Sequence, residues 1–258
     1  MGRIMLEVAY DGSAYHGWQM EPGVPTVESC LNAALERLTG ERIQVSGASR
    51  TDAGVHALGN LCVLDTESPI PPARMGAALQ AYLPPDIVIR DSRAVAADFH
   101  PRFCDSVKEY EYTLYRDPKA NPLVRNRSWH IYRHLDPEAM ARGGAQMVGE
   151  QDFASFCAAG AQVSSTVRRI LSLDIREEGP FLIINVRGNG FLYNMVRIIS
   201  GTLVQLGLGR WPVERVSQII AARDRSQAGP TAPPQGLCLM KIDLFPAGYP
   251  EGLWKEGR

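Results

Sequence analysis

The chain has 258 residues, enough to bury the core of one large or two modest domains. Hydrophobic residues make up 45 % of it and charged residues 21 %, a globular composition that excludes a disordered chain. The formal net charge of −1 does not suggest a nucleic-acid binder. However, residues 1–98 carry 7 basic and 12 acidic side chains, whereas residues 99–258 carry the remaining 20 and 16. The second half can therefore present a basic face to phosphates, or simply solvated surface arginines.

The five cysteines and five histidines are dispersed, and no Cys-x-x-Cys pair occurs. This spacing fits neither a disulfide framework nor a zinc site, so we expect reduced thiols and no metal. Arg197 interrupts the most apolar stretch, residues 191–208, before it reaches the length of a membrane span. The first residues lack the apolar block of a signal peptide. We therefore expect a cytoplasmic protein with no membrane partner.

In the first hundred residues, hydrophobic patterns predict strands at residues 4–10, 43–46 and 61–65, and an extended segment at 86–95. Thr26 can cap a helix whose apolar residues recur at helical spacing, and Gly40 can end it. Pro71 and Pro72 open a second helix. Two polar loops rich in small residues, 11–19 and 47–56, connect these elements.

After residue 99 a similar order of elements recurs. A strand at 109–116 places Tyr110, Tyr112 and Leu114 on one face. Further elements are a helix at 137–148, a hairpin of strands at 167–177 and 181–187, helices at 191–206 and 213–222, and a strand at 237–244. The pattern predicts an α+β protein of two related lobes, residues 1–100 and 101–258. Each lobe should hold a mostly antiparallel sheet with helices, and the active-site cleft should lie between the lobes.

The loop at 47–56 contains the best candidate for chemistry, Asp52. Small residues let such a loop approach a substrate closely. In an extended stretch Arg50 and Asp52 share a face, and a neighbouring guanidinium keeps a carboxylate ionised, as a nucleophile or cation-stabilising group requires. The alternative is that Thr51 and Asp52 merely close a turn and that Arg50 is their surface partner.

Two residues of the second half have competing interpretations. Its place on the strand favours Tyr110 as one of several core tyrosines, although its amphipathic phenol is also suited to a site. Arg197 adjoins a stripe of small and polar residues along its predicted helix, which could face a cleft. Alternatively, Arg197 covers apolar helix surface with its stem.

The segment Arg50-Thr51-Asp52-Ala53-Gly54-Val55-His56-Ala57 resembles the signature of the TruA family, the tRNA pseudouridine(38-40) synthases. Further blocks at 10–19, 99–103, 152–156, 194–197 and 236–239 resemble that family in order and cover essentially the whole chain. The family usually has glycine where this chain has Ser49, and we expect the small serine to adjust the loop without loss of activity.

The resemblance implies the pseudouridine synthase fold and isomerisation of uridine in the anticodon arm of tRNA, without a cofactor. Breaking the N1–C1′ bond builds positive character at C1′, which a carboxylate can stabilise or trap. By resemblance Asp52 is this catalytic carboxylate, Arg50 enters the space left by the extruded base, and Tyr110 lies against the uracil. Arg197 and Leu239 are further candidates to contact the substrate. Candidates to contact RNA are Arg102, in one of the resembling blocks, and Arg168 and Arg169, in a local cluster of basic residues. A homodimer is also implied.

Two other functions are weighed against this one. A non-catalytic RNA-binding module would bind tRNA without converting it. A glycoside or nucleoside hydrolase would release free uracil, but it would need a second carboxylate near Asp52, and none is evident in the loop.

Overall fold

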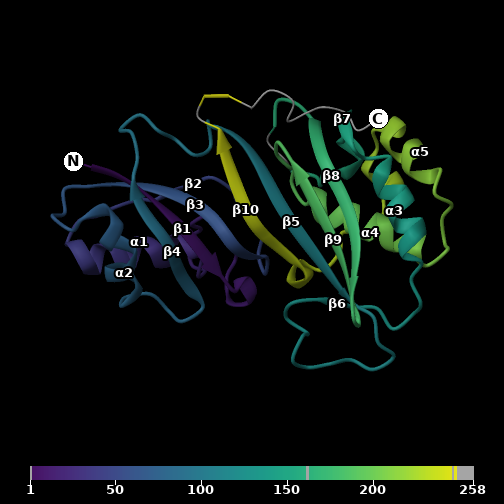
Figure 1. The fold of residues 1–258 in the computed structure, drawn as a ribbon, viewed down its shortest axis with the longest axis horizontal. Coiled ribbons are helices and arrows are strands. Elements are labelled where there is room, and N and C mark those ends of the chain that lie inside the picture. The colour runs from purple at the N-terminus through teal and green to yellow at the C-terminus, as the bar shows by residue number, and fades with distance from the viewer. Residues whose placement is uncertain (1, 161–162, 246, 249–258) are drawn as a thin grey trace. The chain divides into compact units, whose positions relative to one another are not determined.

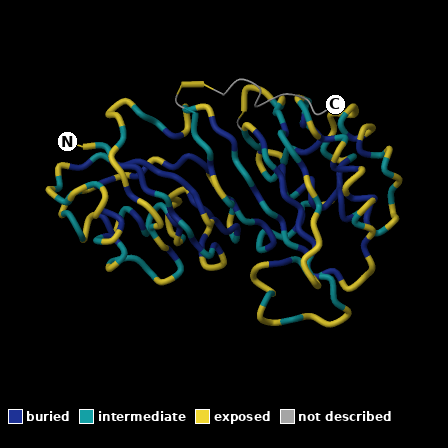
Figure 2. The backbone as a smooth tube through the Cα atoms, viewed as in Figure 1, coloured by how far each residue is buried: buried dark blue, intermediate teal, exposed yellow. Residues whose placement is uncertain are grey.

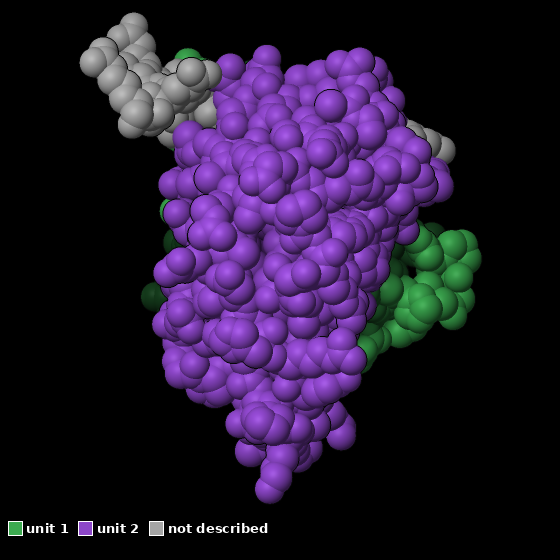
Figure 3. Space-filling model, turned by 90° about the vertical axis from the view of Figure 1, so that its right-hand side faces the viewer, with its two compact units in different colours: residues 1–105, 238–248 green, residues 106–237, 249–258 purple. Residues whose placement is uncertain are grey.

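The computed structural model describes residues 2–160, 163–245 and 247–248. The chain divides into two compact units, unit 1 with Met1–Asp105 and Cys238–Gly248, and unit 2 with Ser106–Leu237 and Tyr249–Arg258 (Figure 3). The predicted lobes were drawn as two continuous segments, 1–100 and 101–258. In the structure the last strand, from Cys238 on, belongs to the first unit, because it pairs with a strand of that unit around His56 and Ala57.

Unit 1 contains a mixed sheet in the order β4-β1-β3-β10, with β2 paired to β3 (Figure 1). Strand β1 runs antiparallel to both β3 and β4, and β10 runs parallel to β3. The strand bounds are β1 Gly2–Tyr10, β2 Ser46–Gly47, β3 His56–Thr66, β4 Ile87–Ala94 and β10 Leu237–Phe245. Figure 2 shows the buried residues following these strands, with exposed residues in the connections.

Helix α1 (Val27–Thr39) begins and ends at the predicted residues. The Thr26 side chain accepts from the Ser29 backbone and the Ser29 side chain accepts from the Thr26 backbone, which forms a capping box. Gly40 ends the helix in the left-handed conformation at φ 77°. The second helix of this unit, α2 (Pro72–Gln80), opens at the predicted proline pair.

Unit 2 contains an antiparallel sheet in the order β5-β9-β8-β7, with the short β6 parallel to β5. Its strands are β5 Asp105–Tyr115, β6 Trp129–His130, β7 Gly149–Asp152, β8 Val167–Glu178 and β9 Phe181–Gly188. Helices α3 (Pro137–Ala145), α4 (Met195–Gly207) and α5 (Arg215–Ala222) complete it (Figure 1). Two glycines let α3 pack closely on its neighbours, since Gly143 lies against Leu206 of α4 and Gly144 against Leu173 of β8.

The predicted α+β class and the mostly antiparallel sheets are confirmed, but several bounds were wrong. Helix α4 begins at Met195 rather than 191, because Asn194 adopts a left-handed φ of 58° that a helix cannot contain. Strand β7 was missed because it is short and polar. Strand β3 begins at His56, directly after the Asp52 loop. In the part of the chain that the structure describes, no helix is long and apolar enough to cross a membrane.

Candidate active site

The Asp52 loop, residues 48–55, joins β2 to β3 in unit 1. Burial alternates along it: Ser49 and Thr51 are buried, whereas Arg50 is exposed and Asp52 is half-buried. This is the alternation expected of an extended stretch, and it puts Arg50 and Asp52 on the more accessible side. The two residues predicted to act together are therefore both available to a substrate.

Main-chain hydrogen bonds tie the Asp52 loop to the segment that follows β1. The amide of Trp18 donates to the Thr51 carbonyl at 3.0 Å, and the amide of Gly54 donates to the Tyr15 carbonyl at 3.2 Å. Within the loop, the amide of Val55 donates to the carbonyl of Asp52 at 3.1 Å. The backbone on both sides of Asp52 is thus fixed by a second loop rather than by a regular element.

Two glycines allow this close approach. A Cβ added to Gly12 would lie 2.0 Å from the Val55 carbonyl oxygen, and one added to Gly17 would lie 2.4 Å from the Thr51 oxygen. Gly17 also has φ +87°, a left-handed conformation that would be strained for a residue with a side chain. The segment 12–17 therefore needs glycine at both places where it touches the Asp52 loop.

A buried polar network supports the loop from the sheet. The Tyr10 hydroxyl and Thr51 Oγ1 are 2.7 Å apart. Asn60 Nδ2 donates to the Ser49 carbonyl at 3.0 Å and to the Tyr10 hydroxyl at 3.3 Å. Because unpaired polar groups are costly in such a site, the network fixes residues 49–51 in one arrangement. Ser49, the departure from the family pattern, occupies a buried position in this network.

Three polar or aromatic residues, one in the Asp52 motif and two in the segment 10–19, have supporting roles here. His56 Nδ1 accepts from the Gly12 amide at 3.0 Å and lies 3.2 Å from Asp11 Oδ1. Asp11 also accepts from the Ser13 amide at 3.0 Å and begins a short 3-10 turn. The ring of Trp18 is 1 % exposed and packs on Gly47, which makes it a loop anchor rather than an open stacking platform.

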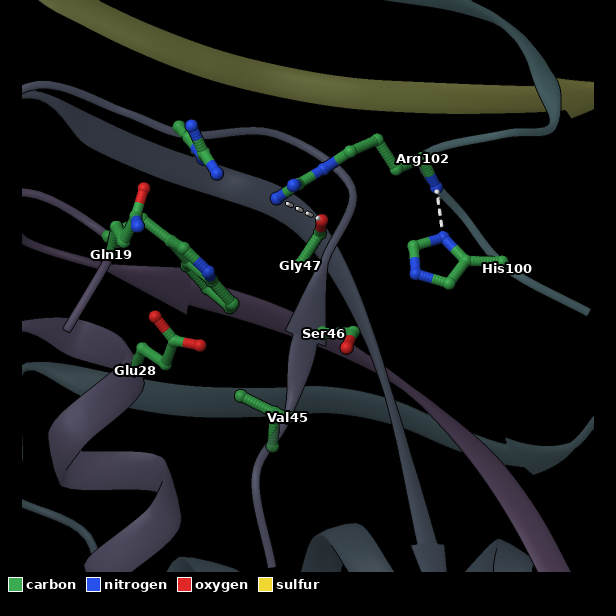
Figure 4. Close-up of a pocket in the computed structure, with 9 residues that line it drawn as sticks. Gln19, Glu28, Val45, Ser46, Gly47, His100 and Arg102 are labelled. Carbon is green, nitrogen blue, oxygen red and sulfur yellow. Dashed lines mark hydrogen bonds between the residues drawn. The ribbon is translucent and has the colours of Figure 1, made fainter.

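A polar pocket of about 180 Å³ lies beside the loop in unit 1 (Figure 4). Arg50, His100, Arg102 and Glu28 are among its lining residues. Arg102 donates from Nη2 to the Gly47 carbonyl at 3.3 Å, which holds it next to β2. Burial lowers the pKa of the Arg102 guanidinium, and the charge of Arg50 lowers it further. The pocket thus brings together two predicted residues, Arg50 and Arg102, that are far apart in the sequence.

Tyr110 lies on β5 in unit 2, where 6 % of it is exposed. Its ring packs edge-on against Phe191 with centroids 5.2 Å apart. Tyr112 on the same face is fully buried, and its hydroxyl donates to the Pro233 carbonyl at 2.8 Å. Burial raises the pKa of Tyr112 far above its usual value, so this tyrosine stays neutral and structural.

Arg197 lies in the first turn of α4 and is half-buried. Its Nε donates to the Ala232 carbonyl at 2.8 Å and its Nη1 donates to Asn194 Oδ1 at 2.6 Å. The small stripe beside it is packed rather than open: Ser200 is buried, and Pro230 lies directly over Gly201. Ser200 and Gly201 therefore face the protein interior, whereas Tyr193 is 49 % exposed, and Arg197 links α4 to the 229–232 segment.

The other predicted contact residues are spread over both units. Leu239 on β10 is 0 % exposed and lies opposite Ala57 of β3, in register with the end of the Asp52 motif. Arg168 donates to the carbonyls of Ser165 and Val167, and burial lowers the pKa of its guanidinium. Arg169, next along β8, lies 3.4 Å from Glu150. Unit 1 thus holds Asp52, Arg50, Arg102 and Leu239, and unit 2 holds Tyr110, Arg197, Arg168 and Arg169.

Sequence reasoning missed two parts of the site. The segment 10–19 was predicted as a loop and as a block resembling the family, but not as the support of the Asp52 loop through its glycines and Tyr10. The signal was present, because small residues at Gly12 and Gly17 commonly mark close approaches of backbone. Sequence reasoning also gave no role to His100. Among the described residues, no group of three or more His, Cys, Asp or Glu is placed to hold a metal.

Comparison with known proteins identifies the class to which these features belong. The family model described as tRNA pseudouridine synthase matches residues 7–104 and 145–244, and the chain belongs to this family of isomerases. Its curated relatives include the tRNA pseudouridine synthase A of Geobacter sp. (strain M21), 44 % identical over 94 % of this chain and 98 % of the relative. The tRNA pseudouridine synthase A of Moorella thermoacetica is 46 % identical over 93 % of this chain and 98 % of the relative.

A solved archaeal box H/ACA Nop10–Cbf5 complex matches 78 % of this chain and 54 % of that chain at 12 % identity. The TM-score of this match is 0.34, which is too low to support a structural comparison.

Proposed function

We propose that this protein isomerises uridine to pseudouridine at positions 38–40 of the tRNA anticodon stem-loop, with Asp52 as the essential carboxylate. The observation that carries the proposal is the backbone clamp on the Asp52 loop. Hydrogen bonds on both sides of this half-buried acid hold it in one place, while Arg50 stands exposed two residues away. A preorganised carboxylate beside an accessible cation suits chemistry at a charged transition state.

Cleavage of the N1–C1′ bond leaves positive character on the sugar, and the uracil must then turn before C5 bonds to C1′. An ionised Asp52 serves this reaction by attack at C1′, by addition to the ring, or by assisting elimination to a glycal. All three routes need the same carboxylate, and none needs a redox partner. Arg50, exposed at the loop, would fill the space of the extruded base and offset part of the cost of unstacking it.

We propose roles in substrate and RNA binding for residues of unit 2 as well. Tyr110 is held on a strand by its edge-on contact with Phe191, which suits a residue that must lie against a uracil. Arg197 is anchored at two acceptors and would present its charge from a fixed position. Arg102, Arg168 and Arg169 would contact the RNA backbone. We further propose that Leu239 contributes to the substrate site. We also propose that the protein works as a cytoplasmic homodimer. Sedimentation velocity would test the homodimer.

The direct test replaces the acid. Asp52→Asn should abolish pseudouridine formation on an unmodified tRNA transcript, read by mass spectrometry after carbodiimide labelling, while tRNA affinity stays within a few-fold. Asp91→Asn is the matched control, since Asp91 is an exposed acid of the same unit that pairs with Arg93 at 3.0 Å. Normal turnover by Asp52→Asn would overturn the mechanism.

The same assay separates the two competing functions. Binding of tRNA by the unaltered protein without conversion would favour a non-catalytic module. Release of free uracil would favour a hydrolase. Mapping pseudouridine by position in tRNA from cells with and without the gene would test the assignment to positions 38–40.

A further inference from the structure

The pocket of unit 1 contains more positive charge than its own acids neutralise. Arg50 lines it from within the Asp52 loop and Arg102 from a later segment of the chain, and the charge of Arg50 contributes to lowering the pKa of Arg102. The pocket has one acidic lining residue, Glu28, whose Oε2 already accepts the Met20 amide at 2.7 Å. An anion bound in the pocket would reduce the repulsion between the two guanidinium groups.

His100 adds a directed donor to this pocket. Its Nδ1 accepts the Arg102 amide at 3.2 Å, so in the neutral ring the proton lies on Nε2. In the close-up the ring stands on the far side of the pocket from Gln19 and Glu28, with its second nitrogen turned towards Ser46 and Gly47 (Figure 4). With Nδ1 accepting the Arg102 amide, the Nε2–H of His100 is the ring donor left for the pocket.

The position of the pocket limits what the anion can be. Arg102 is bonded to the Gly47 carbonyl, which lies at the start of the Asp52 loop, and Arg50 is two residues from Asp52. An anion held here is therefore next to the nucleotide on which Asp52 acts. Guanidinium groups recognise phosphate through paired N–H donors, and RNA carries a phosphate on each side of every nucleotide.

We propose that this pocket is a phosphate subsite that holds one backbone phosphodiester adjoining the target uridine, with Arg102 and His100 as positioning residues. The proposal rests on the proposed function, because the phosphodiester belongs to the tRNA substrate. Capturing a flanking phosphate fixes the backbone around which the target base turns out of the stack. Arg50 would then be shared, since it lines the subsite and lies two residues from Asp52.

Arg102→Gln tests the subsite, with Arg74→Gln as the matched control, because Arg74 is an exposed arginine of α2 in the same unit and outside the pocket. We expect Arg102→Gln to raise KM for tRNA about tenfold and to change kcat far less. The slope of log affinity against log salt should fall by about 0.7 to 0.9, the value for one lost phosphate contact. Arg102→Lys should keep the slope and recover part of the affinity, because it retains the charge without the fork of donors.

A neutral backbone identifies the phosphate. A set of full-length tRNAs each carries one methylphosphonate at a different position near the target uridine. At one of these positions the substitution should raise KM of the unaltered enzyme about tenfold and should not raise KM of Arg102→Gln further. Removing the base of that nucleotide should not change this difference between the unaltered enzyme and Arg102→Gln. Equal KM and salt slope for the Arg102 and Arg74 variants, or additive losses at every methylphosphonate, would overturn the subsite. Failure of the unaltered enzyme to form pseudouridine would instead overturn the proposed function.

Discussion

The two units hold their candidate residues in different ways. In unit 1 Asp52 lies on a loop, and that loop is fixed by another loop through backbone hydrogen bonds and glycine contacts. In unit 2 Tyr110 lies on the long strand β5 and Arg197 on the helix α4, so regular elements position both residues. The difference predicts where each unit is fragile. Small changes remote from Asp52 should reduce catalysis in unit 1, whereas comparable changes in unit 2 should first reduce stability.

The largest effect should come from Gly12→Ala. The added Cβ would lie 2.0 Å from the Val55 carbonyl oxygen, and backbone on both sides must move apart. A displacement of this kind near a reacting group can cost about 100-fold in rate. We expect kcat to fall by about that factor in single-turnover assays of pseudouridine formation. Gly2→Ala is the control, since nothing lies within 4 Å of its added Cβ. An unaltered kcat for Gly12→Ala would contradict the clamp.

The counterpart in unit 2 is Gly201→Ala. Its added Cβ would lie 1.8 Å from the Pro230 carbonyl oxygen, inside a packed contact between α4 and the 229–232 segment. Overpacking of this kind costs about 1–3 kcal/mol of stability. We expect urea denaturation to show that loss, with kcat of the folded enzyme reduced less than in Gly12→Ala. Gly190→Ala, whose Cβ meets only the Arg168 side chain at 3.8 Å, should change neither quantity.

The contrast between the units also explains what the sequence predicted well. Helix α1 was predicted to its ends, because Thr26 and Gly40 specify its caps locally. The hairpin of β8 and β9 was predicted for the same reason, with Gly179 at its turn. The backbone hydrogen bonds that clamp the Asp52 loop were not predicted. They join two loops that lie about 35 residues apart in the sequence, and no local pattern encodes such a contact.

The pocket shows the same limit. Arg50 and Arg102 were each predicted as contact residues from separate motifs, but the sequence does not indicate that they share one hollow. The start of α4 was missed because Asn194 takes a left-handed conformation, which single-residue preferences do not foresee. The assignment of β10 to unit 1 likewise requires knowledge of its pairing with β3.

A smaller effect separates two buried tyrosine hydroxyls. Tyr10→Phe removes the hydroxyl that meets Thr51 Oγ1 and Asn60 Nδ2, so it should cost about 1–3 kcal/mol in unfolding free energy. Because Thr51 precedes Asp52, kcat should also fall several-fold. Tyr112→Phe removes one bond to the Pro233 carbonyl, which should cost about 1 kcal/mol and leave kcat nearly unchanged. Equal effects of the two changes on kcat would remove the distinction between the units.

The smallest effect concerns acid stability. The Arg3 guanidinium, 2.6 Å from Asp65, lowers the pKa of that carboxyl. A carboxyl with a lowered folded-state pKa contributes stability above its unfolded pKa of about 3.9 and loses it as the pH falls through the folded value. Asp65→Asn should therefore destabilise the protein slightly at pH 7, and in urea denaturation the difference should shrink as the pH falls below about 3.9.

Asp224 in unit 2 sharpens this comparison. Its pKa is also lowered, but by hydrogen bonds from Ser226, two residues away. A contact so close in sequence persists partly in the unfolded chain, whereas the Arg3–Asp65 pair spans 62 residues and is lost on unfolding. Asp224→Asn should therefore alter the pH dependence of unfolding less than Asp65→Asn does. A larger effect of Asp224→Asn would show that local caps, and not long-range pairs, set the acid limb of stability.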